Sequence, residues 1–309
     1  NLESIKAYCQ VSKEEAELLD SCEKPIVLLK KNFKKELAPS VTLGLSEIGC
    51  MLPYTPAQAV LLHDFAKAGG TAMVMTSGNI YKEPIVIDDD LALEKFKGIA
   101  DAIVGNNRRI VMRYDDSVCR LMKFGEEQTA IQFIRRARGY APSPIALDST
   151  KQIFAWGAEQ KNTFAFTKKD KCFVSQHIVD IKDAQTLEFF NETRDKYAKL
   201  FDLWPQSYAA DLHPEYLISK EARAAAKKGM LELVQHHHAH IASVLGESNL
   251  EGPAIGFAFD GTGYGTDGCI WGGEVLLANR RDFERFANLA YFPMPGGEAC
   301  IKDPMHMAY

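Results

Sequence analysis

A proline-rich stretch at residues 141–144 (Ala-Pro-Ser-Pro) divides the sequence into two parts that could each form a domain. Proline fixes its backbone torsion and lacks an amide donor, so such a stretch is stiff and extended. The chain has 309 residues, which is about twice the length of a common single domain. We therefore expect two domains, at residues 1–145 and 146–309.

The first part alternates apolar runs with helical patterns, which predicts a mixed α/β domain. Ser12 followed by Glu15 is a capping box at a helix start. Thr55 and Pro56 open a second helix that ends at two glycines, and a third is expected at residues 89–97. The expected strands are residues 26–29, 71–75, 102–104, 110–113, 118–123 and 130–135.

The second part begins with a meander of three strand patterns and continues with alternating strands and helices. This order is typical of the RNase-H-like lobe of actin-like phosphotransferases. The predicted strands are residues 153–156, 163–167, 171–174, 208–211, 231–234 and 254–260, with helices at 183–200, 215–228 and directly after 234, and a glycine-rich hairpin up to about residue 277.

The overall charge excludes some classes of function. Lys and Arg total 36 against 41 Asp and Glu, for a net charge of −5. General nucleic-acid binding depends on neutralising phosphates, so this balance argues against it. No apolar run is long enough for a transmembrane helix, and the seven scattered cysteines suit reduced thiols. We expect a cytoplasmic protein that binds neither membranes nor nucleic acids in general.

Four of the eight histidines lie within residues 235–240 (Gln-His-His-His-Ala-His). Residues i and i+4 share one face of a helix, so His236 and His240 can direct two imidazoles at one metal ion. His237 and His238 lie on other faces, as candidate supporting or substrate groups. His237 also occupies the position of the glutamate in zinc proteases, which disfavours hydrolysis by that route. The alternative is a partly solvated polar helix start.

A strand also runs into glycines at residues 259–268 (Phe-Asp-Gly-Thr-Gly-Tyr-Gly-Thr-Asp-Gly). Glycines let backbone N–H groups approach a phosphate closely. The spacing G-x-G-x-x-G is present, but a strand pattern follows it, which excludes the dinucleotide-binding version. We expect a phosphate loop in which Asp260 contacts a metal or a magnesium-bound water. A plain hairpin is the alternative.

The first part contains a polar loop at residues 76–79 (Thr-Ser-Gly-Asn) and arginines clustered at 108–113 and 135–138. Hydroxyl and guanidinium groups both bind phosphate oxygens. Such a cluster is also common on a solvated face, where Asp115 and Asp116 would pair with it. The pattern alone leaves both interpretations open.

Together these motifs resemble the HypF-type carbamoyltransferases, in the family's order and along nearly the whole chain. Residues 76–79, 107–108, 113–118 and 135–142 resemble its YrdC-like domain, and residues 157–163, 175–177, 236–240, 260–263 and 294–297 its transferase domain. The latter is similar to the threonylcarbamoyl-transferases of tRNA modification. The resemblance implies a mixed α/β, YrdC-like adenylating domain followed by an actin-like, ATPase-type transferase domain.

The family matures nickel–iron hydrogenases, and the resemblance implies the same activity here. An ATP- and Mg²⁺-dependent carbamoyltransferase or ligase would make carbamoyl-adenylate from carbamoyl phosphate and ATP. It would then transfer the carbamoyl group to the C-terminal cysteine of the partner HypE, as the precursor of a cyanide ligand. The transferase domain would hold one transition metal, and the sequence leaves iron and zinc open.

The resemblance also implies individual residue roles. His236, His240 and Asp260 would be the metal ligands and act in catalysis. The expected phosphate- or nucleotide-binding residues are Thr76, Ser77, Asn79, Arg108, Arg113 and Arg138 in the first domain and Glu159, Lys161, Asn162, Gly261, Thr262 and Gly263 in the second.

The chain departs from the family pattern in several modules. It lacks the acylphosphatase and zinc-finger modules, the start of the YrdC-like domain and the last transferase lobe, so we expect an excerpt of a longer protein. Threonylcarbamoyl-type transfer to tRNA is one alternative function, although net acidity and the fused domain order favour a protein target. The other is a non-catalytic fragment that binds nucleotide and metal.

Overall fold

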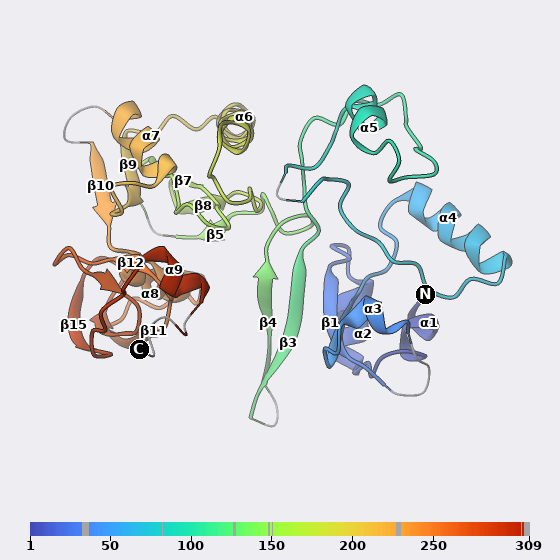
Figure 1. Ribbon diagram of the computed structural model, residues 1–309, viewed down its shortest axis with the longest axis horizontal. Coiled ribbons are helices and arrows are strands. Elements are labelled where there is room, and N and C mark those ends of the chain that lie inside the picture. The colour runs from blue at the N-terminus through green and yellow to red at the C-terminus, as the bar shows by residue number, and fades with distance from the viewer. Residues whose placement is uncertain are drawn as a thin grey trace. The chain divides into compact units, whose positions relative to one another are not determined.

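The computed structural model describes residues 1–32, 37–81, 83–125, 128–147, 149, 151–226, 230–303 and 305. These residues form two compact units (Figure 1). The first unit comprises residues 1–143 together with 174–193, and the second comprises 144–173 together with 194–309. Residues 174–193 therefore return to the first unit after residues 144–173, which belong to the second. Nothing in the sequence pattern predicts this return.

A four-stranded sheet, in the order β2-β1-β3-β4, forms the centre of the first unit. Strand β1 is antiparallel to β2 and parallel to β3, and β3 and β4 are antiparallel neighbours. The capping box predicted at Ser12 and the N-cap predicted at Thr55 are both present, and Gln58 makes the second a capping box as well. The elements are α1 (Leu2–Lys6), α2 (Lys13–Asp20), β1 (Ile26–Lys30), α3 (Pro39–Thr42), β2 (Glu47–Cys50), α4 (Pro56–Lys67), α5 (Asp89–Lys95), β3 (Val118–Phe124) and β4 (Gln128–Arg135).

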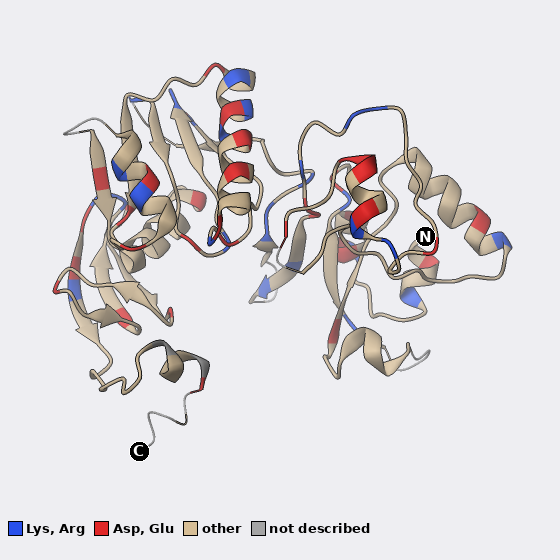
Figure 2. Ribbon diagram, turned by 45° about the horizontal axis from the view of Figure 1, so that its top comes forward, with Lys and Arg blue, Asp and Glu red and all other residues tan. Residues whose placement is uncertain are grey.

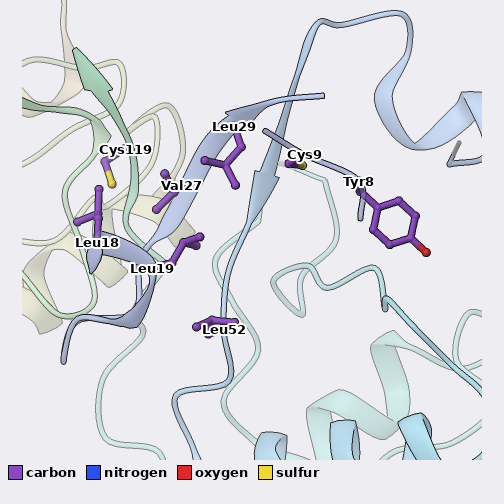
Figure 3. Packing of buried hydrophobic residues seen from close by; sticks show 8 residues of the cluster. All are labelled: Tyr8, Cys9, Leu18, Leu19, Val27, Leu29, Leu52 and Cys119. Atoms are coloured by element: carbon purple, nitrogen blue, oxygen red, sulfur yellow. The ribbon is translucent and has the colours of Figure 1, made fainter. Parts of the chain in front are cut away.

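The core of the first unit surrounds β1 (Figure 3). Alternate residues of a strand face the same side, and Val27 and Leu29 of β1 are both fully buried. They pack in one cluster with Leu18 and Leu19 of α2 and with Cys119 of β3. The burial of these side chains anchors β1 and β3 in the centre of the sheet.

Three predicted strands of the first unit are wrong. Residues 71–75, 102–104 and 110–113 are irregular, although their apolar runs favour strands. Val74, Val104 and Val111 are 75%, 96% and 61% exposed, so these runs bury little apolar surface. A strand needs a hydrogen-bonded neighbour, and these residues pair with none of the sheet's four strands. Conversely, residues 47–50 contain no apolar run, yet they form β2 by pairing with β1.

The second unit contains a six-stranded sheet in the order β10-β9-β6-β7-β8-β5. Strands β6 and β7 are antiparallel, whereas β9 and β10 extend the sheet in parallel from β6. This order agrees with the predicted RNase-H-like lobe. The elements are β5 (Ile145–Ala146), β6 (Ile153–Ala155), β7 (Ala165–Lys168), β8 (Lys171–Val174), α6 (Ala184–Phe201), which begins in the first unit, β9 (Ser207–Asp211), α7 (Leu217–Ala225) and β10 (Leu231–Val234).

A smaller sheet, β11-β14-β15, follows, and helix α8 packs against β11 and β14. Ile241 and Leu245 of α8 meet Leu276 of β14 in a buried cluster that also holds Trp271. This packing fixes the helix that carries the histidines. The remaining elements are α8 (His236–Glu247), β11 (Ala254–Ala258), β12 (Gly263–Tyr264), β13 (Ile270–Trp271), β14 (Glu274–Ala278), β15 (Phe283–Asn288) and α9 (Glu298–Lys302).

The charged residues of both signs are interspersed along α6 and α7 (Figure 2). This distribution agrees with the small net charge of the sequence. Over the part of the chain that the structure describes, no helix combines the length and the apolar character that crossing a membrane requires.

Candidate functional site

The histidine helix starts where its sequence allows a cap. Strand β10 ends at Val234, and the side chain of Gln235 accepts a hydrogen bond from the backbone N–H of His238 at 2.9 Å. Helix α8 therefore begins at His236, with His240 one turn further along the same face. The centroids of the two imidazole rings lie 4.8 Å apart.

Asp260 completes a group of three ligand atoms. It follows β11 by two residues, and its Oδ2 lies 3.0 Å from Nε2 of His236 and 3.7 Å from Nε2 of His240. The three ligand atoms all lie within 4.8 Å of one another. Two imidazoles and a carboxylate are a ligand set suited to zinc or iron. The side chain of His240 is 53% exposed, so the cluster is open to solvent on one side.

A second carboxylate, which the sequence analysis did not assign, fixes the orientation of His236. Oδ2 of Asp211 lies 2.6 Å from Nδ1 of His236, and the Asp211 side chain is only 5% exposed. The hydrogen bond to Asp211 raises the pKa of His236 although burial opposes the rise. Because Asp211 accepts a hydrogen bond from Nδ1–H of His236, Nε2 is left to face the ligand cluster, as in carboxylate–histidine pairs that support metals.

The sequence feature that could have identified Asp211 as a site residue is its position at the end of a predicted strand. Strands β9 and β10 are parallel, and Asp211 lies opposite Val234. Their carboxyl ends therefore share one edge of the sheet, and α8 starts two residues after Val234. A polar last residue on the preceding strand would have identified Asp211 as a neighbour of His236.

His237 and His238 face the interior. Nε2 of His238 lies 2.9 Å from the carbonyl oxygen of Asn279, so this histidine ties α8 to the turn after β14. His237 is fully buried, its Nδ1 lies 3.3 Å from Nε2 of Gln235, and burial lowers its pKa. Its Nε2 has no hydrogen-bond partner among the described residues. Both histidines support the helix start rather than the ligand cluster.

The glycine-rich segment lies against the same helix start. A Cβ atom added at Gly263 would fall 2.5 Å from Cε1 of His237, so only glycine fits there without a shift. The backbone N–H of Gly261 donates to Oδ1 of Asp260 at 2.9 Å. Strands β12 and β13 then form the predicted hairpin. The hairpin thus places Gly261, Thr262 and Gly263 directly after the carboxylate of the ligand cluster.

The turn at residues 157–163 combines buried and exposed predicted residues. The amide Nδ2 of Asn162 donates to the carbonyls of Trp156 at 3.0 Å and Ala158 at 2.6 Å, so this side chain shapes the turn. Glu159 accepts from the N–H of Leu217 at 3.3 Å, which ties the turn to the start of α7. Lys161 is exposed. Nucleotide contacts by these three residues stay a prediction.

In the first unit, Asn79 and Arg113 line a cavity of about 40 Å³ together with Asp115 and His177. Ser77 joins them because its hydroxyl donates to Oδ1 of Asp115 at 3.0 Å. We refer to Ser77, Asn79 and Arg113 as the polar site. Thr76 and Arg108 are exposed and are not among the residues lining this cavity.

Arg138 lies elsewhere and is engaged by other groups. Its Nε donates to Asp116 at 2.7 Å, and its two terminal nitrogens donate to the carbonyls of Glu23 and Lys24 at 2.8 Å. Its guanidinium also stacks 3.4 Å from the ring centroid of Tyr54. These contacts agree with the alternative in which an arginine of the cluster pairs with an acidic neighbour. A phosphate contact by Arg138 remains a prediction.

Three family models match the chain in succession. A YrdC-type model, described as "Telomere recombination", matches residues 1–137. The model "HypF Kae1-like domain" matches residues 148–247, and "Carbamoyltransferase, Kae1-like Domain, second subdomain" matches residues 256–309.

Curated relatives and a solved structure match along the whole chain. Carbamoyltransferase HypF2 of Cupriavidus necator is 41% identical over 100% of this chain and 40% of its own length. Carbamoyltransferase HypF of Synechocystis sp. is 40% identical over 100% of this chain and 39% of its own. A crystal structure of full-length HypF in the phosphate- and nucleotide-bound form matches with a TM-score of 0.90 and 44% identity, over 99% of this chain and 47% of that one. The chain thus spans about two fifths of the curated relatives' length.

The ligand cluster generates a prediction about metal content. Replacing both His236 and His240 by alanine should abolish metal retention, because one carboxylate cannot hold the ion alone. Asp211→Asn should weaken metal affinity about 10- to 100-fold, since it touches the metal only through His236. Elemental analysis and chelator competition measure both effects. His63→Ala, on the exposed face of α4, is the control, and equal loss in this control would contradict the assignment.

The polar site generates a prediction about pH. Burial alone would raise the pKa of Asp115, but hydrogen bonds from His177 and Ser77 and the charge of Arg135 lower it below its ordinary value. A depressed carboxyl pKa stabilises the fold above the unfolded value of about 3.9, and this contribution disappears as pH falls through the folded pKa.

Asp115→Asn should therefore lower the free energy of unfolding most at neutral pH. The difference from the unchanged protein should shrink as pH falls below about 4. Denaturant unfolding at several pH values measures it, with the exposed Asp101→Asn as the control. A difference that stays constant down to acid pH would contradict the assigned charge interactions.

Proposed function

Because this chain belongs to the HypF carbamoyltransferase family, we propose that it activates a carbamoyl group with ATP and transfers it to a cysteine of another protein. The substrates are carbamoyl phosphate and ATP with Mg²⁺. Water releases the phosphate of carbamoyl phosphate, and the oxygen of the resulting carbamate attacks the α-phosphorus of ATP, which displaces pyrophosphate and gives carbamoyl-adenylate as the intermediate. The acceptor is the C-terminal cysteine of HypE in hydrogenase maturation. The observation that carries this proposal is the His236–His240–Asp260 cluster beside a glycine-rich turn.

In this proposal, the second unit supplies the transfer site. His236, His240 and Asp260 hold iron or zinc, and a bound metal of this kind polarises a carbonyl group as a Lewis acid. Asp211 keeps the proton on Nδ1 of His236 and so holds the imidazole in one orientation. The N–H groups of Thr262 and Gly263 provide donors for phosphate oxygens next to Asp260, and Gly261, whose own N–H donates to Asp260, forms the turn between them. The similar crystal structure of full-length HypF is a phosphate- and nucleotide-bound form, which supports phosphate recognition.

The first unit supplies the adenylating site. Ser77 and Asn79 present hydroxyl and amide groups, and Arg113 presents a guanidinium at the same small cavity. Positive charge there offsets the negative charge that develops on the pyrophosphate leaving group. We assign adenylation to the domain at residues 1–145 and transfer to the domain at 146–309, with Thr76, Arg108 and Arg138 as further phosphate contacts of the first. Glu159, Lys161 and Asn162 serve the nucleotide in the second.

Transfer needs no nucleophile from this chain. The acceptor thiolate attacks the carbamoyl carbon of the adenylate, a carbon–sulfur bond forms, and the carbon–oxygen bond to AMP breaks. The protein's task is to exclude water and to orient a reactive mixed anhydride. We place this activity in the cytoplasm, where the seven free cysteines of the chain would remain reduced.

Carbamoyl transfer to a protein acceptor tests the proposal. With ATP, Mg²⁺ and labelled carbamoyl phosphate, label should appear on HypE and should disappear when the terminal cysteine of HypE is replaced by serine. The same reaction with tRNA is the control, because threonylcarbamoyl transfer is the competing function. Label on tRNA and none on HypE would overturn the proposed acceptor.

A further inference from the structure

The polar site of the first unit receives support from a distant part of the sequence. Residues 174–193 follow strand β8, yet they belong to the compact first unit. Four residues of this stretch contact Arg113 of the polar site or the neighbouring Asp115: Gln176, His177, Phe189 and Glu192. The proposed function assigns these four residues no part.

His177 acts on the polar loop through one carboxylate. Its Nδ1 lies 3.1 Å from Oδ2 of Asp115, and the other oxygen of Asp115 accepts the hydroxyl of Ser77 at 3.0 Å. The side chain of Asp115 is only 14% exposed, and that of His177 is 19% exposed. A mostly buried carboxylate that accepts one hydrogen bond on each oxygen restricts the positions of both donor side chains relative to one another. His177 is thus linked to Ser77 through the two oxygens of one carboxylate.

Arg113 is held by the same stretch of chain. The side-chain amide of Gln176 donates to its backbone carbonyl at 3.0 Å. Its guanidinium lies 3.4 Å from a carboxylate oxygen of Glu192 and 5.2 Å from the ring centroid of Phe189. Its Nε donates to the carbonyl of Ile85 at 2.8 Å, just beyond the polar loop. A flexible arginine is restricted to one orientation by these contacts.

Asn79 turns the polar loop back on itself. Its Nδ2 donates to the carbonyls of Ile80 at 3.0 Å and Glu83 at 3.1 Å. The backbone N–H of Val86 also donates to the carbonyl of Gly78 at 2.9 Å. These bonds close the loop locally, but none of them ties it to β3 or to the core. That connection runs from Ser77 to Asp115, whose carboxylate contacts His177 and also lies 3.7 Å from Nη1 of Arg135. The backbone carbonyl of Asp115 accepts from the N–H of Arg138 at 3.1 Å.

From these contacts we propose that His177 is a positioning residue of the adenylating site, which acts through Asp115 on Ser77. The inference rests on the proposed adenylating function of this site. Its consequence is that residues 1–145 do not hold a complete adenylating site, because Gln176, His177 and Glu192 lie in a later part of the chain. Activation and transfer then depend on one continuous polypeptide.

Two amide substitutions of His177 test the proposal in the full chain. The side-chain nitrogen of asparagine takes the place of Nδ1, whereas that of glutamine takes the place of Nε2. His177→Asn should therefore keep the bond to Asp115, and His177→Gln should lose it. Amide hydrogen exchange of residues 77–81 should be unchanged in the first variant and about 10-fold faster in the second and in His177→Ala.

A second measurement follows carbamoyl-phosphate-dependent release of pyrophosphate from ATP. His177→Gln and His177→Ala should lower kcat/KM about 10- to 100-fold, and His177→Asn should restore it to near the unchanged value. Lys182→Ala, an exposed change in the same stretch, is the matched control and should alter neither measurement. Denaturant unfolding confirms that each variant is folded.

Equal behaviour of the asparagine and glutamine variants in hydrogen exchange would overturn the positioning role. If the unchanged chain released no pyrophosphate, the proposed function would fail, while hydrogen exchange would still decide whether His177 positions the loop. The two failures are therefore distinguishable.

Discussion

The imidazole of His236 lies between two carboxylates, and the candidate transfer site depends on this arrangement. Asp211 fixes one ring nitrogen and Asp260 approaches the other, from the ends of two different sheets. Without Asp211 the ring could rotate away from His240, and without the glycine at 263 the loop that carries Asp260 could not lie against His237. The register of β9 and β10 places Asp211, the cap of α8 places His236, and the absence of a side chain at residue 263 leaves room for the loop that carries Asp260. Together they determine the surroundings of Nε2 of His236.

The sequence predicted this cluster as far as local geometry determines it. His236 and His240 follow from helical periodicity, and Asp260 follows from a strand that runs into glycines. Asp211 was missed because its contact with His236 arises from the parallel register of β9 and β10, and the sequence marks it only as a polar residue at the end of a predicted strand. The RNase-H-like order was predictable for the opposite reason, since each of its strands is a distinct apolar run.

In the first unit, sequence patterns were less informative. Residues 71–75, 102–104 and 110–113 favour strands by composition, but strand formation depends on a pairing partner that composition does not specify. The packing of residues 174–193 in this unit was likewise not predictable, because it depends on tertiary contacts that composition does not specify. Ser77 and Arg113 were identified as candidates, and Asp115 was expected only as a partner of the arginine cluster, whereas its link from His177 to Ser77 became visible only in the fold.

The central claim is that one chain carries two separable chemistries, adenylation in the first unit and carbamoyl transfer at the His236 cluster in the second. Carbamoyl-phosphate-dependent exchange of labelled pyrophosphate into ATP, measured beside carbamoyl transfer to HypE in the His236→Ala/His240→Ala variant, tests it most directly. The account predicts that this variant retains pyrophosphate exchange and loses transfer. Loss of both activities together, or transfer at the unchanged rate, would contradict it.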